Sequence, residues 1–292
     1  MQSISIIGAG RVGSALAIAL DRGAYRVDSV VYRSDRFLSF LRSALPPETK
    51  FLKSINDESL SSEILFITSG DPEIQAIAED VAKHSTLPRF AFHTSGSLSS
   101  SELSTLAEKG VLTGSMHPLA AVSNPESGAE RFRGAYFCVE GDEEAVRLAK
   151  ELATVIGGKP FSIPSESKPV YHAAAVMSAG HVVALLDAAI EVMGHCGLSP
   201  EESREILIPL AAGSIENLKD RSPSAALTGP YARGDASTLS RHLSSFDRSG
   251  VGEELRGIYL DLALRSVDIM AAEGHDLGQL REAILIAKHQ AE

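Results

Sequence analysis

The sequence has no tryptophan and only two cysteines, and aromatic residues make up 5% of its 292 positions. Cys138 and Cys196 lack the spacing of a metal or redox motif, so we expect no metal site and reduced thiols in a cytoplasmic protein. An excess of positive charge is also absent, because 27 basic residues face 38 acidic ones and the formal net charge is −11. This balance argues against nucleic acid and anionic membranes as partners.

Long uninterrupted hydrophobic runs are absent as well. The most apolar long stretch, residues 171–193, contains His172, His181, Asp187 and Glu191. Because a membrane-spanning helix needs about 20 predominantly apolar residues, we expect this stretch to be a core helix and no membrane partner. No signal peptide is predicted before the first apolar segment, which begins close to the first residue.

A glycine-rich motif follows that first segment. Residues 4–7 are apolar and predict a buried strand, and Gly8, Gly10 and Gly13 follow before a helical pattern that Gly23 can end. In dinucleotide-binding domains such glycines allow a tight turn, the approach of a pyrophosphate, and close packing of helix on strand. The helix N-terminus also offers N–H groups to that pyrophosphate. We therefore predict cofactor contacts from Gly8, Gly10, Arg11, Val12 and Gly13.

The end of the second predicted strand, residues 27–32, indicates which dinucleotide binds. NAD-binding chains usually carry an acidic residue there, about 20 residues after the glycines, for the ribose 2′-hydroxyl. Here Arg33 and Ser34 hold that place, with Arg36 nearby. Guanidinium and hydroxyl groups bind a 2′-phosphate, so we expect NADP(H). Asp35 leaves the ribose alternative open, because an acid at that position could still reach the 2′-hydroxyl.

Short apolar runs then alternate with helical patterns as far as Ile163. This alternation predicts a doubly wound parallel sheet, an α/β Rossmann domain over residues 1–163. Ligands of such sheets bind beyond the carboxyl ends of the strands. Loops at these ends contribute three further predicted cofactor contacts, Ser69, Ser95 and Gly96. Two histidines in similar positions, His93 and His117, fit a structural role and a functional role equally well.

Beyond Ile163 the composition changes to helical patterns alone. We therefore expect an all-α domain over residues 164–292, for substrate binding and dimerisation. Its helices are predicted at about 166–196, 201–219, 235–244, 251–273 and 277–289. The first of these carries Lys168 and His172, which are four residues apart and share a helix face.

Lys168 and His172 are the predicted catalytic residues. An ammonium beside a substrate carbonyl could donate a proton to the developing alkoxide or stabilise its charge during hydride transfer. His172 could hold the substrate or share the proton. The structural alternative is a solvated lysine with a packed histidine. Arg233, in the loop at residues 227–235, fits either pairing with Asp235 or binding of a substrate carboxylate.

Several motifs together resemble a known family. Besides the glycine loop they are His-x-Ser-Gly at 93–96, His117-Pro118, Lys-x-x-Tyr-His-x-Ala at 168–174 and Thr-Gly-Pro-x-x-Arg-Gly-Asp at 228–235. They resemble Rossmann-like proteins grouped under a domain of unknown function, some members of which act as alternative ketopantoate reductases. The layout is more distantly similar to the 3-hydroxyacid dehydrogenase and 6-phosphogluconate dehydrogenase-like superfamily. That superfamily carries Lys-x-x-x-Asn on the corresponding helix, so Lys168 fits while His172 replaces the asparagine.

The resemblance implies an NADPH-dependent reductase of a small 2-oxo acid, with ketopantoate (2-dehydropantoate) as the leading candidate. Two alternatives remain open. One is an imine reductase similar to pyrroline-5-carboxylate reductase, and the other is a non-catalytic NADP-binding sensor. A proton-donating Lys168 favours the 2-oxo acid, because imine reduction needs no such ammonium and a sensor needs none.

We also expect a homodimer built through the helical domain. Small residues at 173–175 and 178–180 allow close helix approach, and the apolar positions that follow leave few polar ones facing outward. An isologous two-fold interface is the commonest way to cover such a surface.

Overall fold

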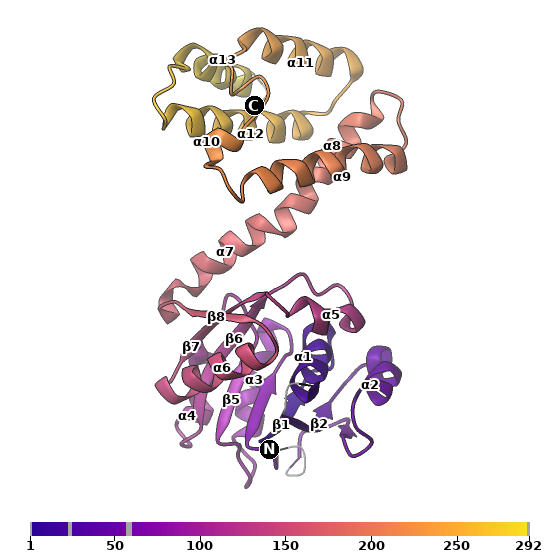
Figure 1. Cartoon of the computed structure of the whole chain (residues 1–292), viewed down its shortest axis with the longest axis vertical. Coiled ribbons are helices and arrows are strands. Elements are labelled where there is room, and N and C mark those ends of the chain that lie inside the picture. The colour runs from indigo at the N-terminus through magenta and orange to yellow at the C-terminus, as the bar shows by residue number, and fades with distance from the viewer. Residues whose placement is uncertain (1, 23–24, 57–59, 291–292) are drawn as a thin grey trace. The chain divides into compact units, whose positions relative to one another are not determined.

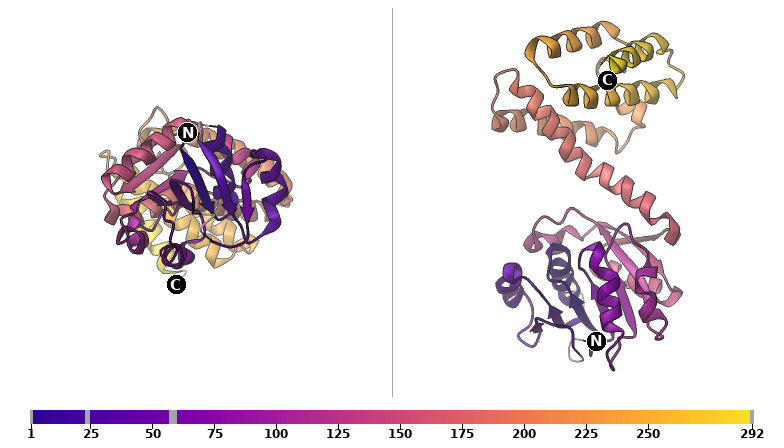
Figure 2. Two further views of the ribbon diagram at one scale, coloured as in Figure 1. Left: turned by 90° about the horizontal axis from the view of Figure 1, so that it is seen from below. Right: turned by 180° about the vertical axis from the view of Figure 1, so that it is seen from behind.

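The computed structural model describes residues 2–22, 25–56 and 60–290. The chain divides into two compact units, Met1–Ala179 and Gly180–Glu292. The first unit is an α/β domain and the second consists of helices, as Figures 1 and 2 show.

The first unit contains an eight-stranded sheet in the order β3-β2-β1-β4-β5-β6-β7-β8. Neighbouring strands are parallel except for β6 and β7, which are antiparallel. The fold-class prediction is confirmed, with two differences: the antiparallel pair, and β3, a three-residue edge strand too short to leave a periodic pattern. The strands are β1 (Ser3–Ile7), β2 (Arg26–Val31), β3 (Lys50–Leu52), β4 (Ile64–Ile67), β5 (Phe90–His93), β6 (Leu112–Leu119), β7 (Tyr136–Gly141) and β8 (Lys159–Ser162).

Helices cover both faces of this sheet (Figure 1). In β4, Phe66 joins the hydrophobic core on one face and Leu65 joins the core on the other, because alternate side chains of a strand point in opposite directions. One core is completed by α1 (Arg11–Arg22), α2 (Leu38–Ala44), α5 (Pro125–Arg131) and α6 (Glu143–Val155), and the other by α3 (Asp71–Val81) and α4 (Ser104–Ala107). The predicted end of α1 at Gly23 lies outside the described residues.

The predicted helix over residues 166–196 is not continuous. A 3₁₀ turn, η3 (Ser165–Ser167), precedes α7 (Lys168–Ser178), and α8 (Gly180–Gly194) follows. Ala179 interrupts the regular backbone between them, with φ −124° and ψ −74°. The division between the compact units falls at this break, later than residue 163, because the first turn of α7 packs onto the sheet through the buried Lys168.

The segment from Ser165 to Gly194 is long and apolar enough to cross a membrane by length and composition alone. We expected a core helix here, but α7 buries only Lys168 and α8, all of whose residues are described, buries none. The apolar surface of α8 is therefore exposed within the single chain.

The second unit has its hydrophobic core among three helices, as residues such as Leu239, Leu260 and Ile284 pack together. Ser199 caps α9 in a capping box with Glu202, which fixes where that helix begins. Helices α8 and α9 contact each other but supply no side chain to the core formed by α11, α12 and α13. The helices after α8 are α9 (Pro200–Asn217), α10 (Pro223–Ala226), α11 (Ala236–Ser249), α12 (Glu253–Ala271) and α13 (Gly278–His289).

Candidate functional site

The glycine motif forms the turn between β1 and α1. Gly8 has φ +112°, a conformation that favours glycine. A Cβ on Gly13 would lie 2.0 Å from the Gly8 carbonyl oxygen and 2.3 Å from Thr68 Oγ1, so only glycine lets α1 approach the strands this closely. A Cβ on Gly10 would meet no atom within 4 Å, which leaves open space above the turn. The first N–H groups of α1, which begins at Arg11, border this space.

A pocket of about 990 Å³ opens from this turn across the ends of β1, β2 and β4. Its volume is at the upper end of the range for small-molecule sites, about 300–1,000 Å³. The pocket is locally basic in a chain whose net charge is −11. Its charged lining residues are Arg11, Arg33, Arg36, Lys53, Lys83, Glu73 and Asp80.

Arg33 and Ser34 lie at the end of β2, where the sequence predicts a 2′-phosphate site. The Arg33 guanidinium is exposed and forms an ion pair with Glu73 on α3, at 2.6 Å between Nη2 and Oε2. The Ser34 hydroxyl caps the 3₁₀ turn η1 (Asp35–Phe37) by accepting from the Arg36 N–H at 3.3 Å. Both residues line the pocket, and the Glu73 carboxylate would compete with a phosphate for the Arg33 guanidinium.

Lys53 is a second cation at this end, and the sequence analysis missed it. It follows the short strand β3 and its Nζ lies 3.7 Å from Asp35 Oδ1 and 5.5 Å from the centre of the Tyr32 ring. Lys53 therefore offsets the acidic charge of Asp35 that left the NAD alternative open. Asp35 is absent from the described lining of the pocket, while Lys53 and Arg36 belong to it.

Ser69, at the end of β4, lines the same pocket. Its Oγ is buried and has no hydrogen-bond partner among the described residues. A buried hydroxyl without a partner is unusual in a folded chain and marks a place where a ligand oxygen or a water would bind. Together with the open space over Gly10 and the basic lining, this hydroxyl fits an extended, anionic dinucleotide.

By contrast, polar groups at the ends of β5 and β6 bond to one another. We call the loop after β5, which contains Ser95 and Gly96, the closed loop. His93 Nδ1 accepts the Ser95 N–H at 3.1 Å, so Nε2 carries the ring proton and donates to the Ser99 carbonyl at 2.9 Å. Burial, helped by the charge of Lys168, lowers the pKa of His93 to about 4. His93 therefore has a structural role. The Ser95 hydroxyl accepts the N–H groups of Ser97 and Leu98, so it shapes the loop. Neither Ser95 nor Gly96 is among the described residues that line the pocket.

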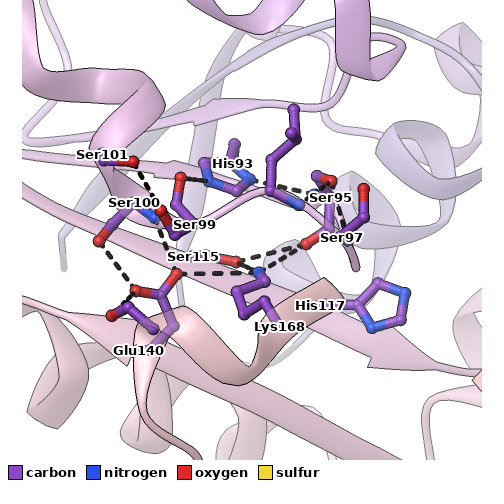
Figure 3. A network of polar contacts seen from close by, with 12 residues as sticks. His93, Ser95, Ser97, Ser99, Ser100, Ser101, Ser115, His117, Glu140 and Lys168 are labelled. Atoms are coloured by element: carbon purple, nitrogen blue, oxygen red, sulfur yellow. Dashed lines mark hydrogen bonds and ion pairs between the residues drawn. The ribbon is translucent and has the colours of Figure 1, made fainter. Parts of the chain in front are cut away.

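Lys168 lies beneath this loop with a side chain that is 0% exposed. Its Nζ donates to the Ser95 carbonyl at 2.8 Å and to the Ser115 hydroxyl, and it lies 3.8 Å from Glu140 Oε1 (Figure 3). Burial lowers the pKa of Lys168, while the charge of Glu140 raises it. Direct proton donation by Lys168 stays a prediction, and two N–H bonds of the ammonium already have acceptors, with the Glu140 carboxylate in ion-pair contact.

His172 lies one helical turn after Lys168 and covers Gly96. A Cβ on Gly96 would lie 2.3 Å from His172 Nδ1 and 2.9 Å from His117 Cε1, so both rings approach the same glycine. His172 Nδ1 is buried without a partner among the described residues. His117 Nδ1 lies 2.7 Å from the Tyr171 hydroxyl, and burial lowers the pKa of His117 to about 4. These rings form the polar surface beside the closed loop.

The structure thus separates the predicted site residues into two groups within the first unit. Around the pocket it brings together Gly8, Gly10, Arg11, Arg33, Ser34 and Ser69. Val12 packs against the core and Gly13 supports the turn from behind. The second group, at the closed loop, consists of Ser95, Gly96, Lys168 and His172.

Comparison with known proteins agrees with this architecture. A family model described as a Rossmann-like domain matches residues 1–118, and the model of a domain of unknown function, DUF2520, matches residues 135–266. The resemblance expected from the motifs is thereby confirmed. No curated protein matches the sequence.

Solved structures share the fold. Protein TM1727 from Thermotoga maritima is 24% identical, with a TM-score of 0.71 over 93% of this chain and 100% of that one. BF3122 from Bacteroides fragilis is 21% identical, with a TM-score of 0.70 over 91% and 97%. The 1-pyrroline-5-carboxylate reductase from Streptococcus pyogenes is 16% identical, with a TM-score of 0.62 over 99% and 98%. At these identities the similarity establishes the fold alone.

Proposed function

We propose that this chain, in which a Rossmann-like domain is followed by a DUF2520 domain, is an NADPH-dependent reductase of a small carbonyl or imine compound. The observation that carries the proposal is the basic pocket at the glycine turn, with the unpartnered Ser69 hydroxyl in its wall. When bound, the nicotinamide supplies a hydride, and the chain has to bind the cofactor, orient the substrate and provide a proton.

Different residues of the pocket bind different parts of the cofactor. The first N–H groups of α1, above Gly10, bind the pyrophosphate, as helix N-termini do. Arg33, Arg36 and Lys53 bind the 2′-phosphate, with the backbone around Ser34 shaping that end. A multiply charged phosphate gains more from these cations than a ribose hydroxyl does, so the site favours NADPH over NADH.

The substrate is a 2-oxo acid in our leading proposal, with ketopantoate first by family resemblance. His172 is the proposed proton-sharing or substrate-orienting residue, because its ring lies against Gly96 beside His117. The buried position of Lys168 weakens the argument that an ammonium selects a carbonyl substrate. An imine substrate is therefore the second candidate, and the similar fold of a pyrroline-5-carboxylate reductase supports it.

A substrate panel tests the proposal. NADPH oxidation is followed at steady state with ketopantoate, other 2-oxo acids and cyclic imines at equal concentrations. We expect turnover with at least one 2-oxo acid. Turnover with imines alone supports the second candidate. A chain that binds NADPH and reduces no compound of either class contradicts the reductase proposal and supports the sensor alternative.

We propose in addition that a second copy of this chain covers the exposed apolar surface of α8 and α9. Val183 and Leu210 are each 68% exposed, and Ile206, Ile208, Ile215 and Leu218 are exposed as well. The charged Asp187 and Glu191 in α8 disfavour a lipid environment. Because an isologous contact covers the same apolar surface on both copies, a homodimer is the simplest occupant. The free cysteines fit a reducing compartment such as the cytoplasm.

Light scattering at micromolar concentration tests the dimer. We expect twice the mass of the chain for the unmodified protein, and a monomer for the Val183→Glu/Leu210→Glu variant. Lys109→Glu, which makes the same change of net charge on an exposed position of the first unit, outside α8 and α9, is the matched control and keeps the dimer. A monomeric unmodified protein, or recovery only with detergent or lipid, contradicts the proposal.

A further inference from the structure

Glu140 and Lys168 form a buried ion pair whose partners come from distant parts of the first unit. Glu140 lies on β7 and Lys168 begins α7, and their side chains are 3% and 0% exposed. The ammonium donates to the carbonyl of Ser95, in the loop after β5, and to the hydroxyl of Ser115 on β6. Two N–H groups of Lys168 thus have acceptors in the protein, and the ammonium also lies in ion-pair contact with Glu140 (Figure 3).

The carboxylate of Glu140 has its own set of donors. Its Oε1 accepts the Ser100 N–H at 2.9 Å, and its Oε2 accepts the hydroxyls of Ser100 at 2.9 Å and Ser165 at 2.6 Å. Ser100 begins the 3₁₀ turn η2 (Ser100–Leu103), and Ser165 begins η3, directly before α7. Glu140 therefore bonds both the segment after β5 and the segment that leads into α7, as Figure 3 shows for its Ser100 contacts.

A buried pair of this kind rarely repays its desolvation, so hydrophobic residues of similar volume would often be as stable. What the pair does provide is a fixed geometry. It joins the Ser95–Gly96 turn to the first turn of α7, and His172 lies on the same helix face one turn later. A displacement of either segment would separate the His172 ring from Gly96.

We propose that Glu140 and Lys168 are a positioning pair that holds His172 and His117 against Gly96, and that neither presents an atom to the substrate. This inference rests on the proposed function for its catalytic consequence, but the positioning itself is a property of the chain alone. Glu140 is the residue that the sequence pattern does not mark, since it is the penultimate residue of β7 and has no motif around it.

A double-mutant cycle tests the pair. Glu140→Gln and Lys168→Met each leave a buried charge without its partner, while the double variant leaves none. We expect each single variant to lower the melting temperature of the first unit by about 6 °C or more, and the double variant to regain at least half of that loss. Glu130→Gln, in an ion pair with Arg22 that is exposed on both sides, is the matched control and leaves the melting temperature unchanged.

Imidazole NMR signals report the position of the rings without any substrate. The signals of His172 and His117 are assigned from the spectra of His172→Asn and His117→Asn. We expect both signals to shift in the two single variants and to return towards their original positions in the double variant. Unshifted signals in both single variants contradict the positioning role, whatever the protein reduces.

Turnover separates positioning from direct proton donation. With the best substrate, we expect the double variant to recover kcat to within about tenfold of the unmodified enzyme, and NADPH affinity to stay within about twofold throughout. A double variant with native imidazole signals but kcat still about 10²- to 10⁴-fold low, the usual effect of losing a general acid, contradicts the inference and makes Lys168 the proton donor. If the unmodified protein reduces nothing, the proposed function fails while the NMR cycle still decides the positioning role.

Discussion

Two parts of the sheet in the first unit differ at the carboxyl ends of their strands. We call the ends of β1, β2 and β4 the open end and the ends of β5 and β6 the closed end. At the ends of β1, β2 and β4 polar groups surround an open pocket, where Arg33 and Lys53 are exposed and the buried Ser69 hydroxyl has no partner among the described residues. At the ends of β5 and β6 the polar groups are buried and bonded to one another through Lys168 and Glu140. The open end can therefore bind a ligand, whereas the closed end fixes the geometry of the loop after β5 and the first turn of α7. Substitutions of groups that face the pocket should therefore affect ligand affinity, and substitutions at the closed end should affect stability.

The glycine turn separates these effects most strongly. Gly13→Ala forces a Cβ to within 2.0 Å of the Gly8 carbonyl oxygen, so we expect a loss of about 3 kcal/mol in the free energy of unfolding. Gly10→Ala places its Cβ in open space, so stability stays within about 0.5 kcal/mol. The same methyl group blocks the approach of the pyrophosphate and lowers NADPH affinity at least about tenfold, or 1.4 kcal/mol. Chemical denaturation and cofactor titration measure both effects, and a Gly10→Ala variant that binds NADPH normally contradicts the assignment.

The closed end predicts a dependence of stability on pH. The pKa of His93 is lowered to about 4 in the folded protein, against an ordinary value of 6.5. Between these pH values the unfolded chain binds more protons at His93 than the folded chain does. The contribution of His93 to the free energy of unfolding is therefore complete above pH 6.5 and decreases as the pH falls towards 4. The full contribution is about 3 kcal/mol. Between pH 7 and pH 5 the free energy of unfolding should lose about 2 kcal/mol of this contribution, since pH 5 is still above the folded pKa, and His93→Gln should show a smaller difference between the two pH values. An unchanged difference would mean that His93 does not titrate with unfolding.

At the open end, Arg33→Asp should narrow or reverse the preference for NADPH over NADH. The substitution replaces a cation that attracts the 2′-phosphate by an anion that repels it and can accept from a ribose hydroxyl. We expect NADPH affinity to fall at least about tenfold, equal to 1.4 kcal/mol, while NADH affinity is kept or improved. Parallel titrations of both cofactors decide this. Equal losses of affinity for NADPH and NADH would show that Arg33 contacts a part of the cofactor that both molecules share.

The smallest expected effects come from the neighbours of Arg33. Lys53→Gln removes a cation and should lower NADPH affinity by about two- to fivefold. Glu73→Gln releases Arg33 from its ion pair and should raise NADPH affinity by a similar factor, since exposed ion pairs are worth about 0–1 kcal/mol. NADH affinity should not change in either variant. Changes of the same sign in both variants would contradict the placement of these side chains around the 2′-phosphate.

The open end could be predicted from the sequence because its determinants are local. The glycine spacing and Arg33 lie within one strand–helix–strand segment, so residue order alone brings them together. Lys53 was missed because β3 is a three-residue strand that leaves no periodic pattern. Its signal is the pair of lysines that flank Phe51 and Leu52.

Residues of the closed end were marked by the sequence, but their contacts could not be predicted because they join distant positions. Lys168 meets Ser95 across 73 residues and Ser115 across 53. A lysine at the start of an apolar helix has the same local pattern whether its ammonium faces a substrate or a buried carboxylate. The sequence therefore marked Lys168 as important without indicating where its Nζ lies, and it gave no sign of Glu140. The break at Ala179 was hidden for a similar reason, since the helical periodicity continues across it.

The most direct test of the proposed cofactor site is a titration of the unmodified chain with NADPH and with NADH, followed by cofactor fluorescence at moderate salt. Arg33, Arg36 and Lys53 around one end of the pocket predict that NADPH binds at least about tenfold more tightly, a difference of 1.4 kcal/mol or more. Equal affinities, or tighter binding of NADH, would contradict a 2′-phosphate site at the end of β2.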